Sequence, residues 1–319
     1  MTRREFLLST AASAGARSFA RATGASSTAP SRELVPAIDT HIHLFDPTRP
    51  LGVPWPAKTD PLLYRPHLPE TFRTASSPFR VIGAVVVEAS DWVEDNQWIL
   101  DLAQANDAIV GFIGNLKLGA PDFAPNLKRF AANPLFRGLR LRMGDVQSPE
   151  PAARAASLRL LADHGLTVDL LDGSSLLAPA ARLASDYSSL RFVIDHLPFK
   201  EWDGQPELMR GALAPIANHP NVFVKISDVV RTVDRTVVTD AAHYRPGLDV
   251  LRELFGPERL LYASNWPVSD RVAPYAMVHR VVADYFASRP RAEAEQFFWR
   301  NSLAAYRWLR RGATAALMP

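Results

Sequence analysis

The sequence of 319 residues contains no cysteine, and this absence excludes several classes of site. A disulfide framework, a thiol nucleophile, a cysteine-ligated zinc or iron–sulfur centre and a lipoprotein anchor are all ruled out. No apolar run reaches the ~18 residues that a membrane-spanning helix needs. The sequence also contains no heptad repeats and no clusters of basic residues, so neither a coiled coil nor a basic nucleic-acid-binding face is expected.

The first 22 residues have the pattern of an export signal. Arg3 and Arg4 are followed by Phe6 and Leu7, then by a short alanine-rich stretch and the small-residue pattern at residues 20–22. This arrangement is typical of a twin-arginine signal peptide. Residues 23–36, rich in Ser, Ala, Thr and Pro, predict a disordered linker. We expect the twin-arginine export machinery to bind the precursor, and the mature protein to be periplasmic or secreted.

Removal of this leader also changes the net charge of the protein, and with it the binding partners that the charge favours. The whole chain has a formal net charge of +3, and residues 1–22 alone contribute four arginines against one glutamate, so the mature protein is neutral. A binding partner such as nucleic acid needs a clustered basic face, which is absent. We therefore expect a small-molecule substrate, no nucleic acid, and no membrane contact after the signal has been cleaved.

Residues 37–319 alternate between strand-like and helix-like patterns. Eight mostly apolar segments predict strands, at residues 37–43, 81–89, 108–116, 136–142, 166–172, 190–197, 221–227 and 259–265. Amphipathic segments such as residues 92–106 and 151–165 lie between them. Eight such units predict one α/β domain, a (β/α)8 TIM barrel. An open doubly wound sheet is the rival, but no glycine-rich phosphate loop follows the first strand.

The first predicted strand ends in a pair of histidines within the segment IDTHIHLFDP. Because side chains alternate along a strand, the imidazoles of His41 and His43 should point the same way. Such a pair suits either a metal ion or proton transfer.

Polar residues close the other strands as well, and on a barrel these ends share one active-site face. Four of them also have a structural explanation as a helix cap, a turn residue or a surface ion pair: Glu88, Asn115, Arg142 and Asp172. Five are better explained by a function, because they meet at one rim: His41, His43, Arg140, His196 and Asn265. Lys225 and Ser227 close the seventh strand.

The motifs IDTHIHLFDP, FRGLRLR, FVIDHLPF, VFVKISD and GPERLLYASNWPV together resemble the amidohydrolase-2 family. This branch of the amidohydrolase superfamily includes sugar-acid lactonases and 2-pyrone-4,6-dicarboxylate lactonase. The resemblance covers residues 37–310 in order, including NSLAAY near Asn301 and Tyr306. It implies a barrel like that of metal-dependent hydrolases and a hydrolase activity, with His41, His43 and His196 as catalytic residues and Arg140 as the anchor for a substrate oxygen.

The chain departs from the family pattern at Asn265, where hydrolytic relatives carry the aspartate that activates water. An amide accepts no proton at neutral pH, although it can orient a water molecule. Three alternatives follow: another rim group such as Glu88, Asp172 or a histidine is the base, the reaction is a decarboxylation that needs no such base, or the protein is a non-catalytic exported ligand-binding barrel.

The resemblance also bears on metal binding. Binuclear relatives use a carboxylated lysine on the fourth strand, but FRGLRLR contains none, so we expect at most one divalent ion such as Zn²⁺. His41, His43 and His196 supply three nitrogens for it. A metal-independent mechanism, in which the histidines polarise the carbonyl, remains the alternative.

A long loop, residues 46–70, follows the first strand and is rich in proline. Long loops on barrels are usually functional, so Trp55, Tyr64 and His67 are candidates to close over a ring-shaped substrate. Arg142 and Lys225 complete the expected substrate-binding set. Together these residues suggest a small lactone or cyclic ester that carries carboxylate or hydroxyl groups.

Overall fold

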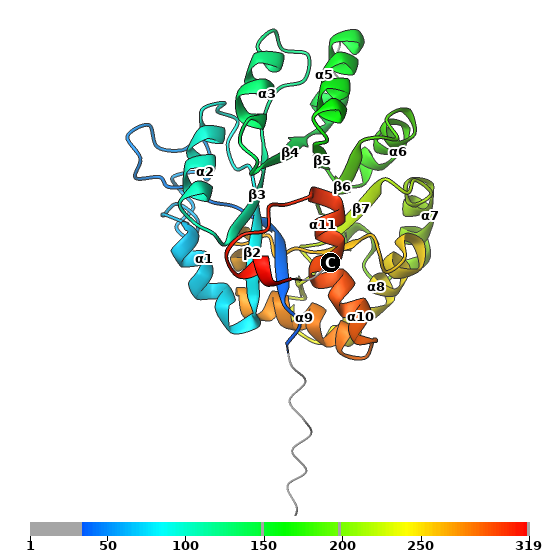
Figure 1. Cartoon of the computed structure of the whole chain (residues 1–319). Coiled ribbons are helices and arrows are strands. Elements are labelled where there is room, and N and C mark those ends of the chain that lie inside the picture. The colour runs from blue at the N-terminus through cyan, green and yellow to red at the C-terminus, as the bar shows by residue number, and fades with distance from the viewer. Residues whose placement is uncertain (1–33, 148–149, 197–198, 318–319) are drawn as a thin grey trace, which may run out of the picture. The chain divides into compact units, whose positions relative to one another are not determined.

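The predicted (β/α)8 fold is confirmed by the order of the strands. The computed structural model describes residues 34–147, 150–196 and 199–317, so the predicted signal peptide and most of the linker lie outside the described residues. Eight strands, all parallel, follow one another round a single sheet in chain order (Figure 1). They are β1 Ala37–Ile42, β2 Val81–Val87, β3 Ile109–Gly114, β4 Phe136–Leu141, β5 Thr167–Leu170, β6 Arg191–Ile194, β7 Val222–Ile226 and β10 Leu260–Tyr262.

The sheet is nearly closed where β1 meets the residues after β10. The amide of His43 donates to the carbonyl of Trp266 at 2.8 Å, and the amide of Asn265 donates to the carbonyl of His41 at 2.9 Å. Near the middle of β1, the Thr40 hydroxyl donates to the carbonyl of Tyr262 at 2.7 Å. These bonds bring the end of β10 beside the histidine pair.

Helices cover the outside of this barrel. They are α1 Pro69–Ser76, α2 Asp95–Gln104, α3 Phe123–Ala131, α4 Met143–Val146, α5 Pro151–Asp163, α6 Leu177–Asp186, α7 Pro206–Ala217, α8 Ala241–Phe255, α9 Tyr275–Ala287, α10 Arg291–Glu295 and α11 Asn301–Tyr306. Proline at the first position of α1, α5 and α7 favours a helix start there, because its missing N–H group is not needed. No helix among the described residues is long and apolar enough to cross a membrane.

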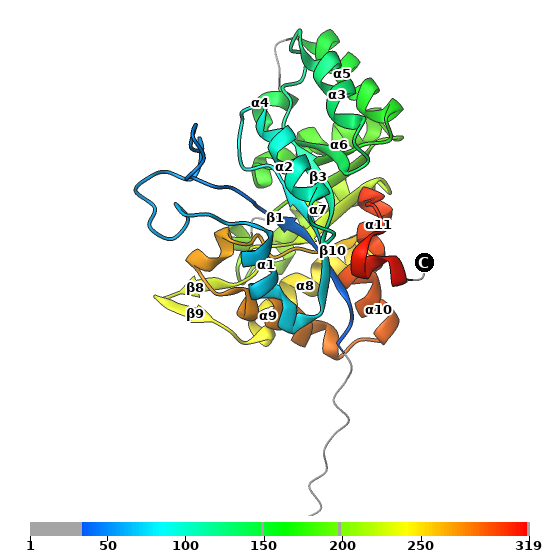
Figure 2. The same ribbon diagram turned by 60° about the vertical axis from the view of Figure 1, so that its left-hand side comes forward.

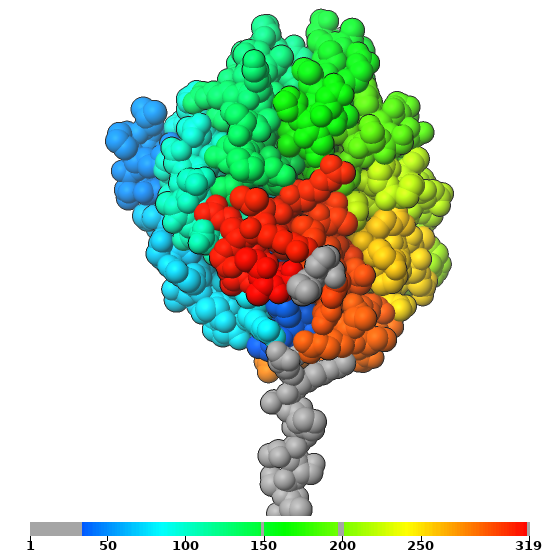
Figure 3. Space-filling model, in the orientation of Figure 1, coloured from blue at the N-terminus to red at the C-terminus, as the bar shows by residue number. Residues whose placement is uncertain are grey.

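Two layers of apolar side chains hold the barrel together. The larger cluster lies between strands and helices, and a smaller cluster, which includes Ile38, Val193 and Phe223, packs with Trp299 and Tyr306. Figure 2 shows the loop after β1 and the C-terminal segment at opposite ends of the barrel. In Figure 3 this C-terminal segment, in red, fills the centre of its face. The carboxyl ends of the strands, from which the loop after β1 leaves, therefore lie at the end of the barrel away from this segment.

Two local features differ from a plain alternation of strands and helices. A short antiparallel hairpin, β8 Arg231–Val233 and β9 Thr236–Val238, follows β7 and was not predicted. In β4, a Cβ atom on Gly138 would lie only 2.0 Å from the carbonyl oxygen of Thr167. The glycine in FRGLRLR therefore allows β4 and β5 to pair closely.

Candidate active site

The polar strand ends surround one basin with a cavity volume of about 690 Å³. Most of the predicted site residues line it: His43, Trp55, Glu88, Arg140, Arg142, His196 and Asn265. The remaining members of the predicted set, His41, Tyr64 and Lys225, are not among its lining residues. Asp228, which the sequence analysis did not single out, does line the basin.

The two histidines of β1 contact each other as the alternation predicted. Their Nε2 atoms lie 3.2 Å apart, and Nδ1 of His43 lies 2.9 Å from the carbonyl oxygen of Val87. Because a carbonyl only accepts, His43 carries its proton on Nδ1 and accepts the Nε2–H of His41. Nδ1 of His41 then accepts from the Lys225 ammonium at 3.2 Å. One continuous hydrogen-bond chain runs from Lys225 through both rings to Val87.

Burial keeps both imidazoles neutral. It lowers the pKa of His43 to about 3, with a further contribution from the charge of Arg140. It also holds the pKa of His41 well below its usual value, and the neighbouring Lys225 acts in the same direction. Near neutral pH the pair therefore carries no positive charge, and its ring nitrogens are engaged in the hydrogen-bond chain from Lys225 to Val87.

Lys225 lies beneath the basin and not in it, which corrects its predicted role in substrate binding. Its side chain is fully buried, and Nζ donates to Asp169 at 2.6 Å, Asp195 at 2.7 Å and His41. The Tyr306 hydroxyl of α11 lies 3.0 Å from Oδ1 of Asp169. All three donors of the ammonium are thus used inside the barrel, so Lys225 acts on the site only through His41.

The two carboxyl groups that share this ammonium have pKa values shifted in opposite directions. Burial raises the pKa of Asp169 to about 8. Burial acts in the same direction on Asp195, but the positive charges of Lys225 and Arg140 outweigh it and hold the pKa of that carboxyl well below its usual range. Sequence analysis passed over both residues, although an aspartate within an otherwise apolar strand was the available signal.

Arg140 and Arg142 both bind Glu88 at the rim. Nε of Arg140 donates to Oε1 of Glu88 at 2.7 Å and Nη2 donates to its backbone carbonyl at 2.6 Å. Nη2 of Arg142 donates to the same Oε1 atom at 2.9 Å. Glu88, predicted as a candidate base, is therefore the counter-ion of two arginines. Nη1 of Arg140 lies 3.8 Å from Asp195, beyond hydrogen-bond distance.

The opposite side of the basin is formed by the ends of β6, β7 and β10. Nδ1 of His196 lies 3.0 Å from the Ser227 hydroxyl and 3.6 Å from Oδ2 of Asp228. Nδ2 of Asn265 donates to Oδ1 of Asp228 at 2.8 Å. Burial lowers the pKa of His196, although the Asp228 carboxylate opposes that shift.

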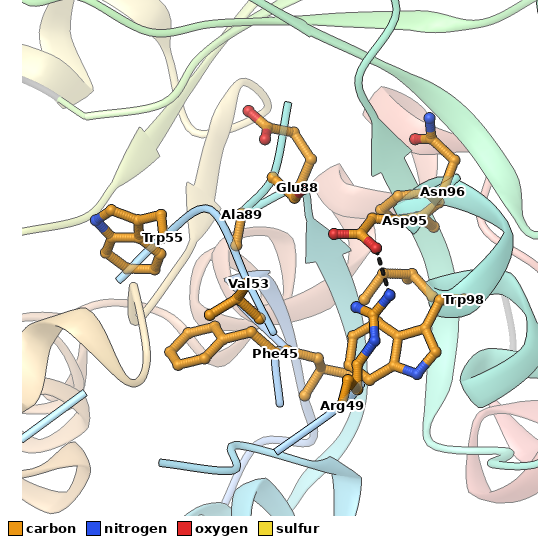
Figure 4. A pocket seen from close by; sticks show the side chains of 13 residues that line it. Phe45, Arg49, Val53, Trp55, Glu88, Ala89, Asp95, Asn96 and Trp98 are labelled. Atoms are coloured by element: carbon orange, nitrogen blue, oxygen red, sulfur yellow. Dashed lines mark hydrogen bonds and ion pairs between the residues drawn. The ribbon is translucent and has the colours of Figure 1, made fainter. Parts of the chain in front are cut away.

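The loop after β1 brings Trp55 to the basin, where its ring centroid lies 6.1 Å from that of His43. The loop is fastened to α2 by Arg49, which donates to Asp95 at 2.6 Å and lies 4.3 Å from the centroid of Trp98. Figure 4 shows this ion pair beside a small crevice under the loop. The crevice has a cavity volume of about 20 Å³, room for about one water-sized group.

Several other predicted residues have structural positions. Tyr64 is half-buried in the same loop, away from the basin, and His67 is buried between Phe45 and Trp266. Asn115 exchanges backbone hydrogen bonds with the Asn96 side chain, while Asp172 accepts from the amide of Met143 at the start of α4. Asp172 thus contacts the start of a helix before its strand and not, as predicted, the helix that follows it.

Asp39 is buried behind the histidine pair and joins β1 to β10 and α9. It accepts from the amides of His41 and Ser264 at 3.2 and 3.0 Å and from the Tyr275 hydroxyl at 3.0 Å. Burial raises its pKa from 3.8 to about 6, although these hydrogen bonds oppose the shift. The folded state therefore binds this proton more tightly than the unfolded state does.

This shift predicts a loss of stability as pH rises. A raised carboxyl pKa stabilises the fold below pH 4, and the stabilisation, about 3 kcal/mol for two units, is lost as pH rises towards and through 6. About 1 kcal/mol of this remains to be lost between pH 5 and 8. We expect urea unfolding to show that decrease for the wild type relative to Asp39→Asn, which cannot ionise. Equal pH slopes for the two proteins would contradict this assignment.

The donors present fit one metal ion better than two. For Zn–N bonds of 2.0–2.1 Å in a tetrahedral site, two ligand nitrogens lie roughly 3.3 Å apart, close to the 3.2 Å between His41 and His43. The His196 ring centroid lies 4.5 Å from that of His41. Within the described ranges, no three His, Asp or Glu side chains converge closely enough to hold an ion. The histidine pair therefore fits an ion, whereas its third protein ligand is not preformed.

Comparisons with known proteins identify lactonases similar to this chain. The chain is 29% identical over 239 residues to an L-fucono-1,5-lactonase of Burkholderia ambifaria, which covers 73% of this chain and 80% of the relative. An L-fucono-1,5-lactonase of Burkholderia multivorans is 26% identical over 84% of this chain and 94% of its own length.

Solved structures share the fold. An amidohydrolase from Burkholderia multivorans, crystallised with bound zinc, has a TM-score of 0.76 and 24% identity over 86% of this chain and 99% of its own. Amidohydrolase 2 from Bifidobacterium longum subsp. infantis has a TM-score of 0.65 with the same identity and coverage. A family model described as amidohydrolase matches residues 38–308, nearly the whole barrel. This chain therefore belongs to the amidohydrolase family and is a hydrolase.

Proposed function

We propose that the protein hydrolyses a small lactone that carries a carboxylate or several hydroxyl groups. The observation that carries this proposal is the meeting of a neutral histidine pair and two arginines at one basin. The similarity to two L-fucono-1,5-lactonases supports it at the level of the reaction. A sugar-acid lactone has the ring size and the oxygen-rich edges that such a basin can bind.

Substrate binding depends on the arginines and on Trp55. Glu88 fixes two sides of the Arg140 guanidinium, which leaves Nη1 for a carboxylate or hydroxyl oxygen of the substrate. Arg142 is 42% exposed in its side chain and adds a second positive charge at the rim. The indole of Trp55 offers a flat apolar surface for one face of the ring.

Hydrolysis places negative charge on the lactone carbonyl oxygen as water attacks. The positive charge of Arg140 at the basin attracts that oxygen through space, and the charge of Lys225 acts through the hydrogen bond to His41. His196, neutral near pH 7, is placed to accept a proton and pass it to the leaving ring oxygen. These groups are buried or half-buried, so their charges are screened less than they would be in water.

A metal ion would add to this chemistry. His41 and His43 are the residues that would hold it, and the zinc in the neighbouring Burkholderia multivorans structure makes zinc the first ion to test. When bound, such an ion polarises a carbonyl and lowers the pKa of its bound water.

The function is tested with a panel of 1,4- and 1,5-aldonolactones, with and without a terminal carboxylate, assayed by proton release. Linear methyl esters of the same acids and a carboxylated phenol serve as comparison substrates. Turnover of lactones above the spontaneous rate is expected. No lactone turnover, either as purified or after addition of zinc, would contradict the proposal, and carbon dioxide release from the phenol would favour a decarboxylase.

We also propose that the mature enzyme works in the periplasm or outside the cell. The proposal rests on the twin arginine and on the small-residue pattern before residue 23. Cell fractionation should find the wild type outside the cytoplasm and the double variant Arg3→Lys, Arg4→Lys retained inside. An unchanged distribution would contradict export by the twin-arginine route.

A further inference from the structure

The basin contains a carboxylate beside the position where the family pattern expects one. Asp228 lies two residues after the end of β7, and Asn265 lies three residues after the end of β10, the neighbouring strand. Their side chains meet across this boundary, because Nδ2 of Asn265 donates to Oδ1 of Asp228 at 2.8 Å. The carboxylate of Asp228, which follows β7, therefore lies beside Asn265, where relatives carry an aspartate after the last barrel strand.

Both residues have an unusual backbone. Their φ angles are +55° for Asp228 and +60° for Asn265, in the left-handed region that few side chains other than Asp and Asn tolerate. Such conformations persist where surrounding structure enforces them and are common at active sites. Here they turn two adjacent strand ends so that a carboxylate and an amide face each other.

The hydrogen bond also fixes which way the amide points. A carboxylate only accepts, so the NH₂ group of Asn265 must face Asp228 and its oxygen must face away. That buried oxygen accepts no hydrogen bond from the described residues. Since Asn265 lines the basin, a water or a substrate hydroxyl is the donor that fits it.

The other carboxylates near the basin are less suited to remove a proton. Oε1 of Glu88 accepts from two arginines, and Asp169 and Asp195 lie buried under Lys225. Asp91 also lines the basin, but the structure gives it no contact with a histidine or with Asn265. Asp228, with a side chain that is 46% exposed, combines access to water with a contact to His196.

We propose that Asp228 is the catalytic base and that Asn265 orients the water it activates. This role rests on the proposed lactone hydrolysis. The Asp228 carboxylate takes a proton from water as the water oxygen bonds to the lactone carbonyl carbon. The bond from that carbon to the ring oxygen then breaks, and the ring oxygen receives the proton that Asp228 took from water, which makes it a hydroxyl and restores the Asp228 carboxylate. One water is consumed, and the product is the open hydroxy acid.

The first experiment exchanges the two side chains. Asp228→Asn removes the base but keeps a residue that tolerates a positive φ, so it should fold and lose at least about 10²-fold in kcat/KM. The double variant Asp228→Asn, Asn265→Asp restores one carboxylate and one amide in reversed positions, and should recover at least tenfold over Asp228→Asn. Asp234→Asn is the matched control, since Asp234 has a φ of +47° but lies exposed in the β8–β9 turn.

The second experiment supplies a base from solution. Asp228→Gly suits the positive φ and leaves room for formate, so its turnover should rise in proportion to added formate while that of the wild type does not. A purely structural role for Asp228 would give no such rescue. Circular dichroism and the melting temperature of each variant confirm that it has folded.

The outcomes separate this role from the proposed function. Asp228 is not the base if the wild type turns over lactones and kcat/KM of Asp228→Asn lies within threefold of the wild-type value. A large loss of kcat/KM in Asp91→Asn instead would also overturn this role. A large loss that neither the exchange nor formate restores would overturn it as well. No turnover by the wild type would contradict the lactonase function and this role together.

Discussion

His43→Ala should lower kcat/KM for lactones by about 10²–10³-fold or more, the effect typical of removing one positioned polar group from an active site. The substitution removes the ring that lines the basin and ends the hydrogen-bond chain from Lys225 to Val87. It also removes one of the two nitrogens that fit a metal ion. Steady-state kinetics at saturating substrate should place most of the loss in kcat.

A histidine outside the site provides the control. His164 is exposed at the end of α5, so His164→Ala should keep kcat/KM within about twofold of the wild-type value. Zinc titration by calorimetry on His43→Ala gives an independent readout, because loss of one ligand should weaken binding whether or not zinc is needed for turnover. If His43→Ala retained a third of the wild-type kcat/KM, the histidine pair would not belong to the catalytic machinery.

Lys225→Met should cost about 3–5 kcal/mol of unfolding free energy, the usual result of removing one partner from a buried ion pair. Methionine has a similar length but leaves Asp169 and Asp195 without their common ammonium. Both carboxyl groups would then have raised pKa values in the folded state. The variant should therefore be most stable at low pH and lose stability as pH rises from about 4, which urea unfolding followed by tryptophan fluorescence can measure.

Tyr306→Phe separates the charge effect from the loss of a single contact. It removes the hydroxyl bonded to Asp169 but keeps the ammonium, so the expected cost is about 1–2 kcal/mol. Activity should follow the same order, because only Lys225→Met frees Nδ1 of His41. A loss below 1 kcal/mol in Lys225→Met, with unchanged pH dependence, would contradict the buried ion cluster described above.

The barrel and much of its rim were predictable from the sequence. The eight apolar runs predicted all eight barrel strands, and the rule that parallel strands end at one face gathered His43, Arg140, His196 and Asn265. The alternation of side chains along a strand was enough to bring His41 and His43 together. These inferences needed only local patterns and the topology of the fold.

Other parts of the site depend on geometry that such patterns do not contain. Alternation predicts which side chains point inward, but not their depth, and so Lys225 was expected at the rim although it lies one layer below. Asp228 lies beyond the end of its strand, where a positive φ and not alternation sets its direction. The hairpin after β7 and the position of Tyr64 depend on loop packing, which carries no periodic signal.

The hydroxyl of Tyr306 extends the active site to the far end of the chain. Tyr306 contacts Asp169, Asp169 binds Lys225, and Lys225 donates to the histidine that begins the chain of imidazoles. Helix α11, at the end of the barrel away from the basin, is thus connected by hydrogen bonds to the histidine pair of the active site. Libraries for changing substrate preference that sample only residues around the basin would overlook this connection, and tags or fusions joined close to α11 would disturb a residue that supports catalysis.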